Sequence, residues 1–205
     1  MEENSLYKRA ITHLEKQDPI LADVIAKIPP LEKRVVGGNY FLDLIETIIS
    51  QQLSIKAADT IWGRFQSLFP KKGITPEAVT QMDTERIRTA GISYQKISYI
   101  KDLAKQVAES GLVFEQFDIM TDEEIITELV KVKGIGQWTA EMLLMFNMGR
   151  PDVFSYGDLG IRKAIQRLYN FKKEPTQKQA EKIAKKWRPY RTIACRYLWK
   201  SLELA

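Results

Sequence analysis

The sequence contains one cysteine, Cys195, and one histidine, His13, in 205 residues. A single thiol forms neither an internal disulfide nor a four-cysteine metal or iron–sulfur site. A single histidine leaves little basis for a histidine metal site, or for the Ser-His-Asp and Cys-His groups of common hydrolases. We interpret His13 as an ordinary helix residue, and we expect no cofactor and no metal site built from side chains.

Long apolar runs are also lacking. No stretch approaches 18 consecutive apolar residues, so the sequence predicts no transmembrane helix. The segment that begins Met1-Glu-Glu-Asn is acidic and does not show the basic-then-apolar pattern of a secretory signal. These features predict a reducing location, cytoplasmic or, in a eukaryote, nuclear. Nothing in the sequence indicates oligomerisation, and we expect a monomer.

The composition indicates a packed protein with a mild positive charge. Apolar residues make up 44% of the chain, enough for a core, and its length suits one large domain or two small, closely packed lobes. The formal net charge of +5 is compatible with a polyanionic partner, although many proteins share such a charge. The basic stretches at 71–72, 172–173 and 182–186 are expected to be solvated faces.

Apolar residues recur at helical spacing almost throughout, and the two strand-like stretches, 35–36 and 112–114, are too short for a sheet. Asn39 is placed to cap a helix over 40–50, and Thr121 begins a capping box. The sequence therefore predicts an all-α protein of about ten short helices joined by short loops.

A glycine-rich segment at 129–140 separates two predicted helices, the second beginning near Thr139. Gly134 and Gly136 permit a tight turn with positive φ and the close approach of another backbone. Free N–H groups at the start of the second helix form an anion site that suits a phosphate. We expect Ile135 to be buried between the helices. The alternative is a plain helix–turn–helix corner that binds nothing.

Asp158 follows this hairpin by about twenty residues, after a loop at 149–157 that contains glycine and proline. It stands at a predicted helix start, where aspartate commonly caps free N–H groups. A capping aspartate is held rigidly and can still face a cleft, so capping and catalysis are compatible. Asp152, six residues earlier, is the weaker candidate and is expected to cap the loop or to be exposed.

Together these segments resemble the helix-hairpin-helix superfamily of DNA glycosylases, in which the hairpin holds the DNA backbone through main-chain amides. The residues in register with the hairpin motif are Leu129, Val132, Gly134, Ile135, Gly136, Thr139 and Ala140. The resemblance implies an all-α fold of two lobes with a cleft between them, and Asp158 as the catalytic carboxylate. It implies a phosphate-binding hairpin formed by Lys133, Gly134, Ile135, Gly136 and Thr139. Hairpin carbonyls in this family often also hold a monovalent cation.

One carboxylate is enough for the chemistry that this resemblance implies. Breaking an N-glycosidic bond builds positive charge on the sugar, which a fixed anion stabilises. The same carboxylate can orient or deprotonate the attacking water. An alkylated base such as 3-methyladenine is already cationic and leaves without a second acid. The absence of a second conspicuous acid is therefore compatible with alkylation repair.

The stretch from about Asn39 to Lys200 is similar to the 3-methyladenine DNA glycosylase II family. The matching segments are Ile49-Ser-Gln-Gln-Leu-Ser54, Trp138, Pro189-Tyr-Arg-Thr-Ile-Ala194 and Tyr197-Leu-Trp199. Longer bacterial members carry an N-terminal β domain, for which these 205 residues leave no room. We therefore expect the compact form, a single glycosylase domain over residues 1–205.

Position 138 separates two branches of the superfamily. In the branch that also cuts the backbone, a lysine at this position attacks the sugar through a Schiff base. Trp138 cannot do so, which predicts a monofunctional enzyme. The resemblance places Trp138 and Trp199 in the base pocket, where aromatic faces attract a cationic base. The alternative is that both are core residues. Met142, where the bacterial family often has tyrosine, is placed in the same pocket and leaves the preferred base open.

The turn before Ser54 is the candidate DNA wedge. An apolar side chain there, Leu53, can enter the base stack and fill the gap left by a flipped nucleotide. Gln52 is expected to touch the DNA beside the lesion. The alternative for Leu53 is burial between two helices.

The expected function is base excision from damaged double-stranded DNA, with alkylated bases of the 3-methyladenine and 7-methylguanine type released to leave an abasic site. Two alternatives stay open. One is a glycosylase specific for uracil, hypoxanthine or a mismatched base, and the other is a protein that binds damaged DNA without catalysis.

Overall fold

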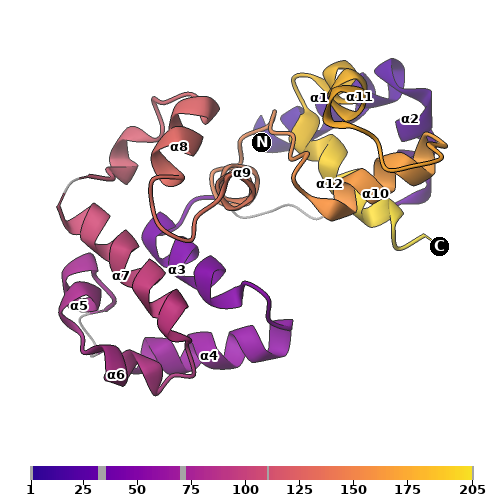
Figure 1. The fold of residues 1–205 in the computed structure, drawn as a ribbon. Helices are drawn as coiled ribbons and strands as arrows, with labels where there is room; N and C mark the ends of the chain where they lie inside the picture. The colour runs from indigo at the N-terminus through magenta and orange to yellow at the C-terminus, as the bar shows by residue number, and fades with distance from the viewer. Residues whose placement is uncertain (1, 32–35, 70–72, 110, 205) are drawn as a thin grey trace. The chain divides into compact units, whose positions relative to one another are not determined.

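The computed structural model describes residues 2–31, 36–69, 73–109 and 111–204. Within these ranges it contains twelve α-helices, two short 3₁₀ helices and no β-strand (Figure 1). The predicted all-α class is confirmed. The number of α-helices exceeds the expected ten or so, and two of the twelve, in the segment 76–88, have only six and five residues.

The chain forms two compact units: unit 1 comprises residues 1–35 and 144–205, and unit 2 comprises residues 36–143. The helices of unit 1 are α1 (Glu2–Gln17), α2 (Pro19–Lys27), α10 (Leu159–Leu168), α11 (Gln177–Ala184), η2 (Lys185–Trp187) and α12 (Arg191–Ser201). Those of unit 2 are α3 (Tyr40–Ser50), α4 (Ile55–Ser67), α5 (Pro76–Gln81), α6 (Thr84–Arg88), α7 (Tyr94–Ala108), η1 (Phe114–Gln116) and α8 (Asp122–Leu129). α9 (Gln137–Phe146) begins in unit 2 and ends in unit 1.

The predicted caps begin the helices as expected. Asn39 accepts a hydrogen bond from the Leu42 amide at 3.2 Å, and Thr121 forms both bonds of a capping box with Glu124. α9, however, begins two residues before the predicted Thr139. The Gly136 carbonyl already accepts a helical hydrogen bond from the Ala140 amide, which leaves only a short turn between α8 and α9.

In unit 2, α7 is the central helix and packs against α3, α5 and α6 (Figure 1). Its apolar face, which includes Ile97, Ile100 and Leu103, is fully buried. Burial of such side chains stabilises the unit by about 1.5–3 kcal/mol each. Polar residues of α7, among them Lys96 and Asp102, form hydrogen bonds with the backbone of neighbouring turns.

In unit 1, α12 packs against α2 and α10, and a buried carboxylate joins neighbouring elements. Asp18 is only 1% exposed. Its Oδ1 caps α2 by accepting from the amides of Ile20 and Leu21, and its Oδ2 accepts from the Tyr169 hydroxyl and the Trp187 indole at 2.6 and 3.0 Å. The sequence did not reveal this cluster, because its members are more than 150 residues apart.

Two further expectations concern the surface. Lys172, Lys173, Lys182, Lys185 and Lys186 are exposed, as expected, whereas Lys71 and Lys72 lie outside the described residues, as does Val35. None of the helices in the described ranges is both long and apolar enough to span a membrane.

Candidate functional site

Asp158 caps the first turn of α10, as predicted. Its Oδ1 accepts a hydrogen bond from the Ile161 amide at 2.8 Å and a second from the Trp199 indole at 2.8 Å. Two donors on one oxygen fix the plane of the carboxylate, because the side chain cannot rotate without breaking both bonds. The predicted catalytic group is therefore held in one orientation by two elements, α10 and α12.

Trp199 contacts this carboxylate closely. A methyl group on Gly160 would lie 3.0 Å from Asp158 Oδ1 and 3.0 Å from the Trp199 ring, so a larger residue would displace one of the two side chains. The indole also packs against Phe146 at a ring distance of 5.5 Å. Trp199 is half-buried and fixes Asp158, a role that the sequence analysis did not assign to it.

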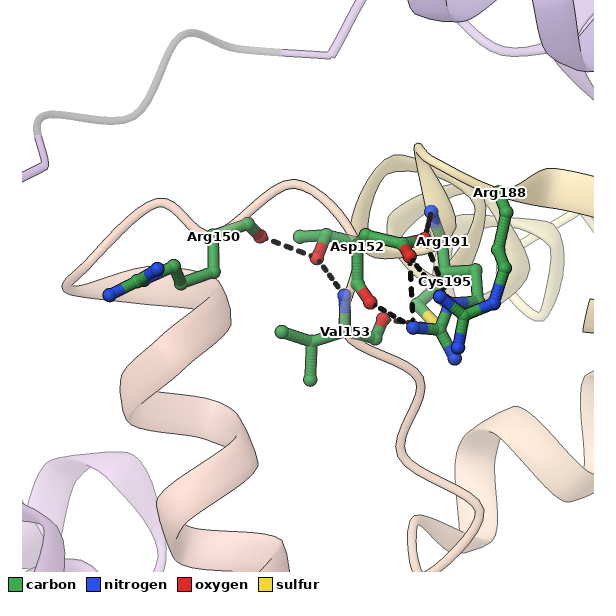
Figure 2. A network of polar contacts seen from close by, with 7 residues as sticks. Arg150, Asp152, Val153, Arg188, Arg191 and Cys195 are labelled. Carbon is green, nitrogen blue, oxygen red and sulfur yellow. Dashed lines mark hydrogen bonds and ion pairs between the residues drawn. The ribbon is translucent and has the colours of Figure 1, made fainter. Parts of the chain in front are cut away.

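Asp152, the weaker acidic candidate, lies in an ion-pair network at the start of loop 149–157 (Figure 2). Arg191 at the start of α12 donates to Oδ1 at 2.8 Å and to Oδ2 at 3.0 Å, and also to the Asp152 carbonyl. Arg188 donates to Oδ2 at 2.9 Å. The Asp152 side chain is 19% exposed. The expectation of a loop cap or an exposed carboxylate was thus incomplete: Asp152 is a partner of two arginines.

Thr192, the next residue of α12, fixes the backbone of the same loop. Its hydroxyl donates to the Arg150 carbonyl at 2.6 Å and accepts from the Val153 amide at 3.0 Å, while its amide donates to the Pro151 carbonyl. The sequence motif Arg191-Thr192 therefore has a structural explanation. It attaches the loop that precedes Asp158 to α12.

The glycine hairpin lies between α8 and α9. Gly134 has a φ of +81°, and a methyl group there would lie only 2.1 Å from the ring of Tyr99. Gly136 does not have a positive φ, contrary to expectation, and its Cβ position is open space. Ile135 is 4% exposed and packs inward as predicted. Gly134 thus faces the protein, and Gly136 leaves the outer side of the turn unobstructed.

Other predicted hairpin residues divide between surface and interior. Lys133 is exposed, and its backbone amide donates to Asp102 Oδ2 at 2.9 Å, so this amide is already bound within the protein. Thr139 is only 4% exposed and does not form part of the hairpin surface. Lys133 and the open backbone at Gly136 remain as the outward-facing members of the predicted set.

The turn at 51–54 carries the predicted wedge. Gln52 has a φ of +59°, an uncommon conformation for a residue other than glycine, and its side chain is exposed. Leu53 is 39% exposed, so it is not the buried residue of the structural alternative. Both side chains protrude from the turn, and the turn's backbone is strained at Gln52.

Two polar side chains that the sequence analysis did not single out hold this turn. Lys96 on α7 donates to the carbonyls of Ile49 and Gln51 at 2.7 and 2.6 Å, and burial lowers the pKa of its amine. Gln51 donates from Nε2 to the Gly134 carbonyl at 3.0 Å. The turn and the hairpin are therefore joined directly within unit 2.

The remaining predicted pocket residues lie on α9. Trp138 is 43% exposed, too much for a core residue, and Met142 is half-buried. Glu141, which precedes Met142, is 4% exposed and accepts a hydrogen bond from Gln137 at 2.8 Å. This buried acid was missed, because nothing in the local sequence distinguishes it from a surface glutamate. Trp138 and Met142 belong to unit 2, whereas Asp158 belongs to unit 1.

No group of three or more His, Cys, Asp or Glu side chains in the described ranges is arranged to hold a metal ion. Among the hairpin carbonyls, that of Gly134 already accepts a hydrogen bond from Gln51. The Gly136 carbonyl accepts one as well, from the Ala140 amide, so each of these two oxygens keeps one lone pair that a monovalent cation can use.

Comparison with curated proteins identifies close relatives. DNA-3-methyladenine glycosylase 1 of Schizosaccharomyces pombe is 41% identical over 170 residues, which cover 80% of this chain and 72% of that protein. The solved structure of the Schizosaccharomyces pombe 3-methyladenine DNA glycosylase Mag1, in complex with abasic DNA, is similar with a TM-score of 0.80 at 34% identity, and covers 96% of this chain and 98% of that one.

A second solved structure, DNA-3-methyladenine glycosidase from Bacillus halodurans, has a TM-score of 0.85 at 36% identity and covers 94% of this chain and 88% of that chain. The family model of the HhH-GPD superfamily base excision DNA repair protein matches residues 45–189, from α3 to the segment before α12. The chain belongs to the HhH-GPD superfamily of base excision DNA repair proteins.

Proposed function

We propose that this protein is a monofunctional DNA glycosylase that releases alkylated bases from double-stranded DNA and leaves an abasic site. The observation that carries the proposal is Asp158, fixed by the Ile161 amide and the Trp199 indole in a chain whose relatives are named 3-methyladenine DNA glycosylases. The whole chain, residues 1–205, acts as one glycosylase domain in this proposal.

Asp158 supplies the negative charge that the reaction needs. As the bond between base and sugar breaks, the sugar becomes cationic, and an anion that is already in place stabilises it without reorganisation. The same carboxylate orients or deprotonates the water that attacks the sugar. A cationic alkylated base leaves without protonation, so no second acid is required.

The other residues bind and expose the damaged nucleotide. The outward side of the hairpin, with Lys133 and the open backbone at Gly136, receives a phosphate. Gln52 and Leu53 protrude and fill the gap left by the flipped nucleotide. Trp138 and Met142, neither of which is buried in the core, contribute side chains that suit a base pocket. Because Trp138 replaces the lysine of the lyase branch, no Schiff base forms and the strand is not cut.

The decisive experiment combines Asp158→Asn with a panel of lesion duplexes. Asparagine also caps helices, so the fold and DNA binding should persist, while base release from 7-methylguanine DNA should fall about 100-fold or more. Asp23→Asn, at an exposed position, is the control. If Asp158→Asn released 7-methylguanine at nearly the parent rate, Asp158 would not be the catalyst.

The lesion panel also separates the alternatives. Release of only neutral bases, such as uracil or hypoxanthine, would contradict the alkylbase assignment. Tight binding of an abasic analogue with no release of any base would indicate a damage-binding protein. Trapping of a covalent DNA adduct by borohydride would contradict monofunctional hydrolysis.

A further inference from the structure

Arg162, one turn into α10, holds the backbone immediately before Asp158. Its Nη1 donates to the carbonyl of Tyr156 at 3.0 Å and to the carbonyl of Gly157 at 2.9 Å. These are the last two residues of the loop. Since Gly157 has no side chain to restrict it, the arginine supplies a constraint that the local sequence lacks.

The guanidinium of Arg162 is committed to the protein and is not a free cation. Its Nε donates to Glu174 Oε1 at 2.5 Å, and it lies 5.5 Å from the centre of the Tyr156 ring. The Tyr156 hydroxyl donates to the carbonyl of Pro175, beside Glu174. The Arg162 side chain is 20% exposed. Because the Arg162 guanidinium is paired with Glu174 and largely buried, it is better suited to holding loop 149–157 in place than to binding a phosphate.

The other end of the same loop is held by a second arginine. Arg191 binds both carboxylate oxygens of Asp152 and the Asp152 carbonyl, and its own side chain is 18% exposed (Figure 2). Bidentate pairs of this kind restrict orientation as well as distance. The loop is thus fixed at both ends, by Arg191 near its start and by Arg162 at its end.

We propose that Arg162 and Arg191 are positioning residues, which act on base release by holding loop 149–157 so that Asp158 keeps one place and direction. This inference rests on the proposed role of Asp158. The stabilisation of a cationic sugar depends strongly on where the anion lies, and a displacement of about 1 Å can cost about 100-fold in rate. Loss of either arginine should therefore slow the chemical step and leave DNA binding unchanged.

The test is a double-mutant cycle between Arg162→Gln and Asp158→Asn. Lys163→Gln, which removes the same charge from the neighbouring exposed position of α10, is the matched control. Single-turnover release of 7-methylguanine at saturating enzyme measures the chemical step, the Kd for DNA with an abasic analogue measures binding, and the melting temperature reports the fold. Arg162→Lys and Arg191→Lys retain the charge and serve if Arg162→Gln does not fold.

We expect Arg162→Gln to slow release about 10- to 100-fold in the parent chain, with unchanged Kd, and to have little effect in the Asp158→Asn chain. Arg162→Lys and Arg191→Lys should each slow release by a smaller factor, again only when Asp158 is present. Lys163→Gln should leave the rate unchanged.

Two results would overturn the inference while leaving the proposed function intact. One is a full rate in all the arginine variants while Asp158→Asn is impaired. The other is an equal loss in both backgrounds, because a residue that acts elsewhere slows release whether or not Asp158 is present. An unimpaired Asp158→Asn would instead contradict the proposed function.

Discussion

At the scale of single residues, one carboxylate, that of Asp158, both caps α10 and is the proposed catalytic group. Its Oδ1 accepts hydrogen bonds from the Ile161 amide and from the Trp199 indole. The family resemblance alone predicted Trp199 in the base pocket. In the structure its indole donates to the carboxylate, and Gly160 leaves the space for this contact. Trp199 can still present a ring face to a base, but its N–H group is bound to Asp158.

Trp199→Phe separates these two contributions. Phenylalanine keeps an aromatic ring beside Phe146 but removes the hydrogen bond to Asp158 Oδ1. A hydrogen bond to a charged group is worth about 1.5–3 kcal/mol, so base release should slow roughly 10- to 100-fold with little change in DNA affinity. Single-turnover kinetics measure this. A rate as fast as the parent's would indicate that the Ile161 amide alone orients the carboxylate.

Gln52 offers a cleaner test of a side chain at the DNA-facing turn. Its positive φ strains a glutamine but not a glycine, so Gln52→Gly removes the side chain while relieving the backbone. We expect the free energy of unfolding to be unchanged or raised by up to about 1 kcal/mol, and base release to fall. Denaturant unfolding and single-turnover kinetics are the measurements. Stability and activity that fell together would contradict this explanation.

At the scale of elements, the hairpin shows that two similar glycines have different reasons to be glycine. The pattern of two glycines around Ile135 predicted the turn and the burial of the isoleucine correctly. It did not distinguish Gly134, which lies against the Tyr99 ring of α7, from Gly136, which faces open space. That distinction depends on Tyr99, which lies 35 residues before Gly134 in the chain, so local spacing cannot supply it.

Alanine at each position should therefore act differently. Gly134→Ala forces a methyl group into the Tyr99 ring at positive φ and should cost about 2–4 kcal/mol of stability. Gly136→Ala should leave the melting temperature within about 1 °C of the parent, since it meets no neighbour, but should weaken DNA binding by obstructing the approach of a phosphate. Equal loss of stability in both variants would refute the assignment of inner and outer glycines.

In the other elements too, local features were predictable from the sequence and contacts between distant residues were not. Helix starts such as Asn39 and Thr121 were predictable, because a cap and the apolar spacing after it are local. The candidate site was predictable as a set of motifs but not as a set of contacts. The ties between Asp152 and Arg191, and between Gln51 and Gly134, join residues 39 and 83 positions apart. Only the fold brings such partners together.

At the scale of the whole molecule, unit 1 depends on partly buried polar contacts between the start and the end of the chain. The Tyr169 hydroxyl donates to Asp18, and the Tyr197 hydroxyl is bonded to that of Tyr7 at 2.6 Å. Tyr7 also accepts from the Leu31 amide, so α1, α12 and the segment after α2 meet at one hydroxyl. Both terminal regions contribute to the core of unit 1, the unit that also carries Asp158 and its supporting helices.

These contacts make the stability of unit 1 sensitive to alkali. Burial raises the pKa of Tyr169, with a further contribution from Asp18, and burial also raises the pKa of Tyr197, with a contribution from Tyr7. In the unfolded chain both tyrosines ionise near their usual pKa of about 10. Because the folded pKa values are raised, their contribution is fully present below about pH 10 and is lost as the pH rises beyond that value.

At pH 11 each tyrosine should therefore have lost up to about 1.4 kcal/mol of its contribution, the free energy that ionisation gives to the unfolded chain one unit above its pKa, and Tyr197, whose hydroxyl contact is only part-buried, should have lost less. Urea unfolding between pH 8 and 11 measures the slope. Tyr169→Phe and Tyr197→Phe should each start from a lower stability and show a shallower decline, since phenylalanine cannot ionise. Tyr94→Phe, at an exposed position of unit 2, should decline as steeply as the parent. Parallel slopes for all four proteins would mean that neither buried hydroxyl accounts for the loss of stability in alkali.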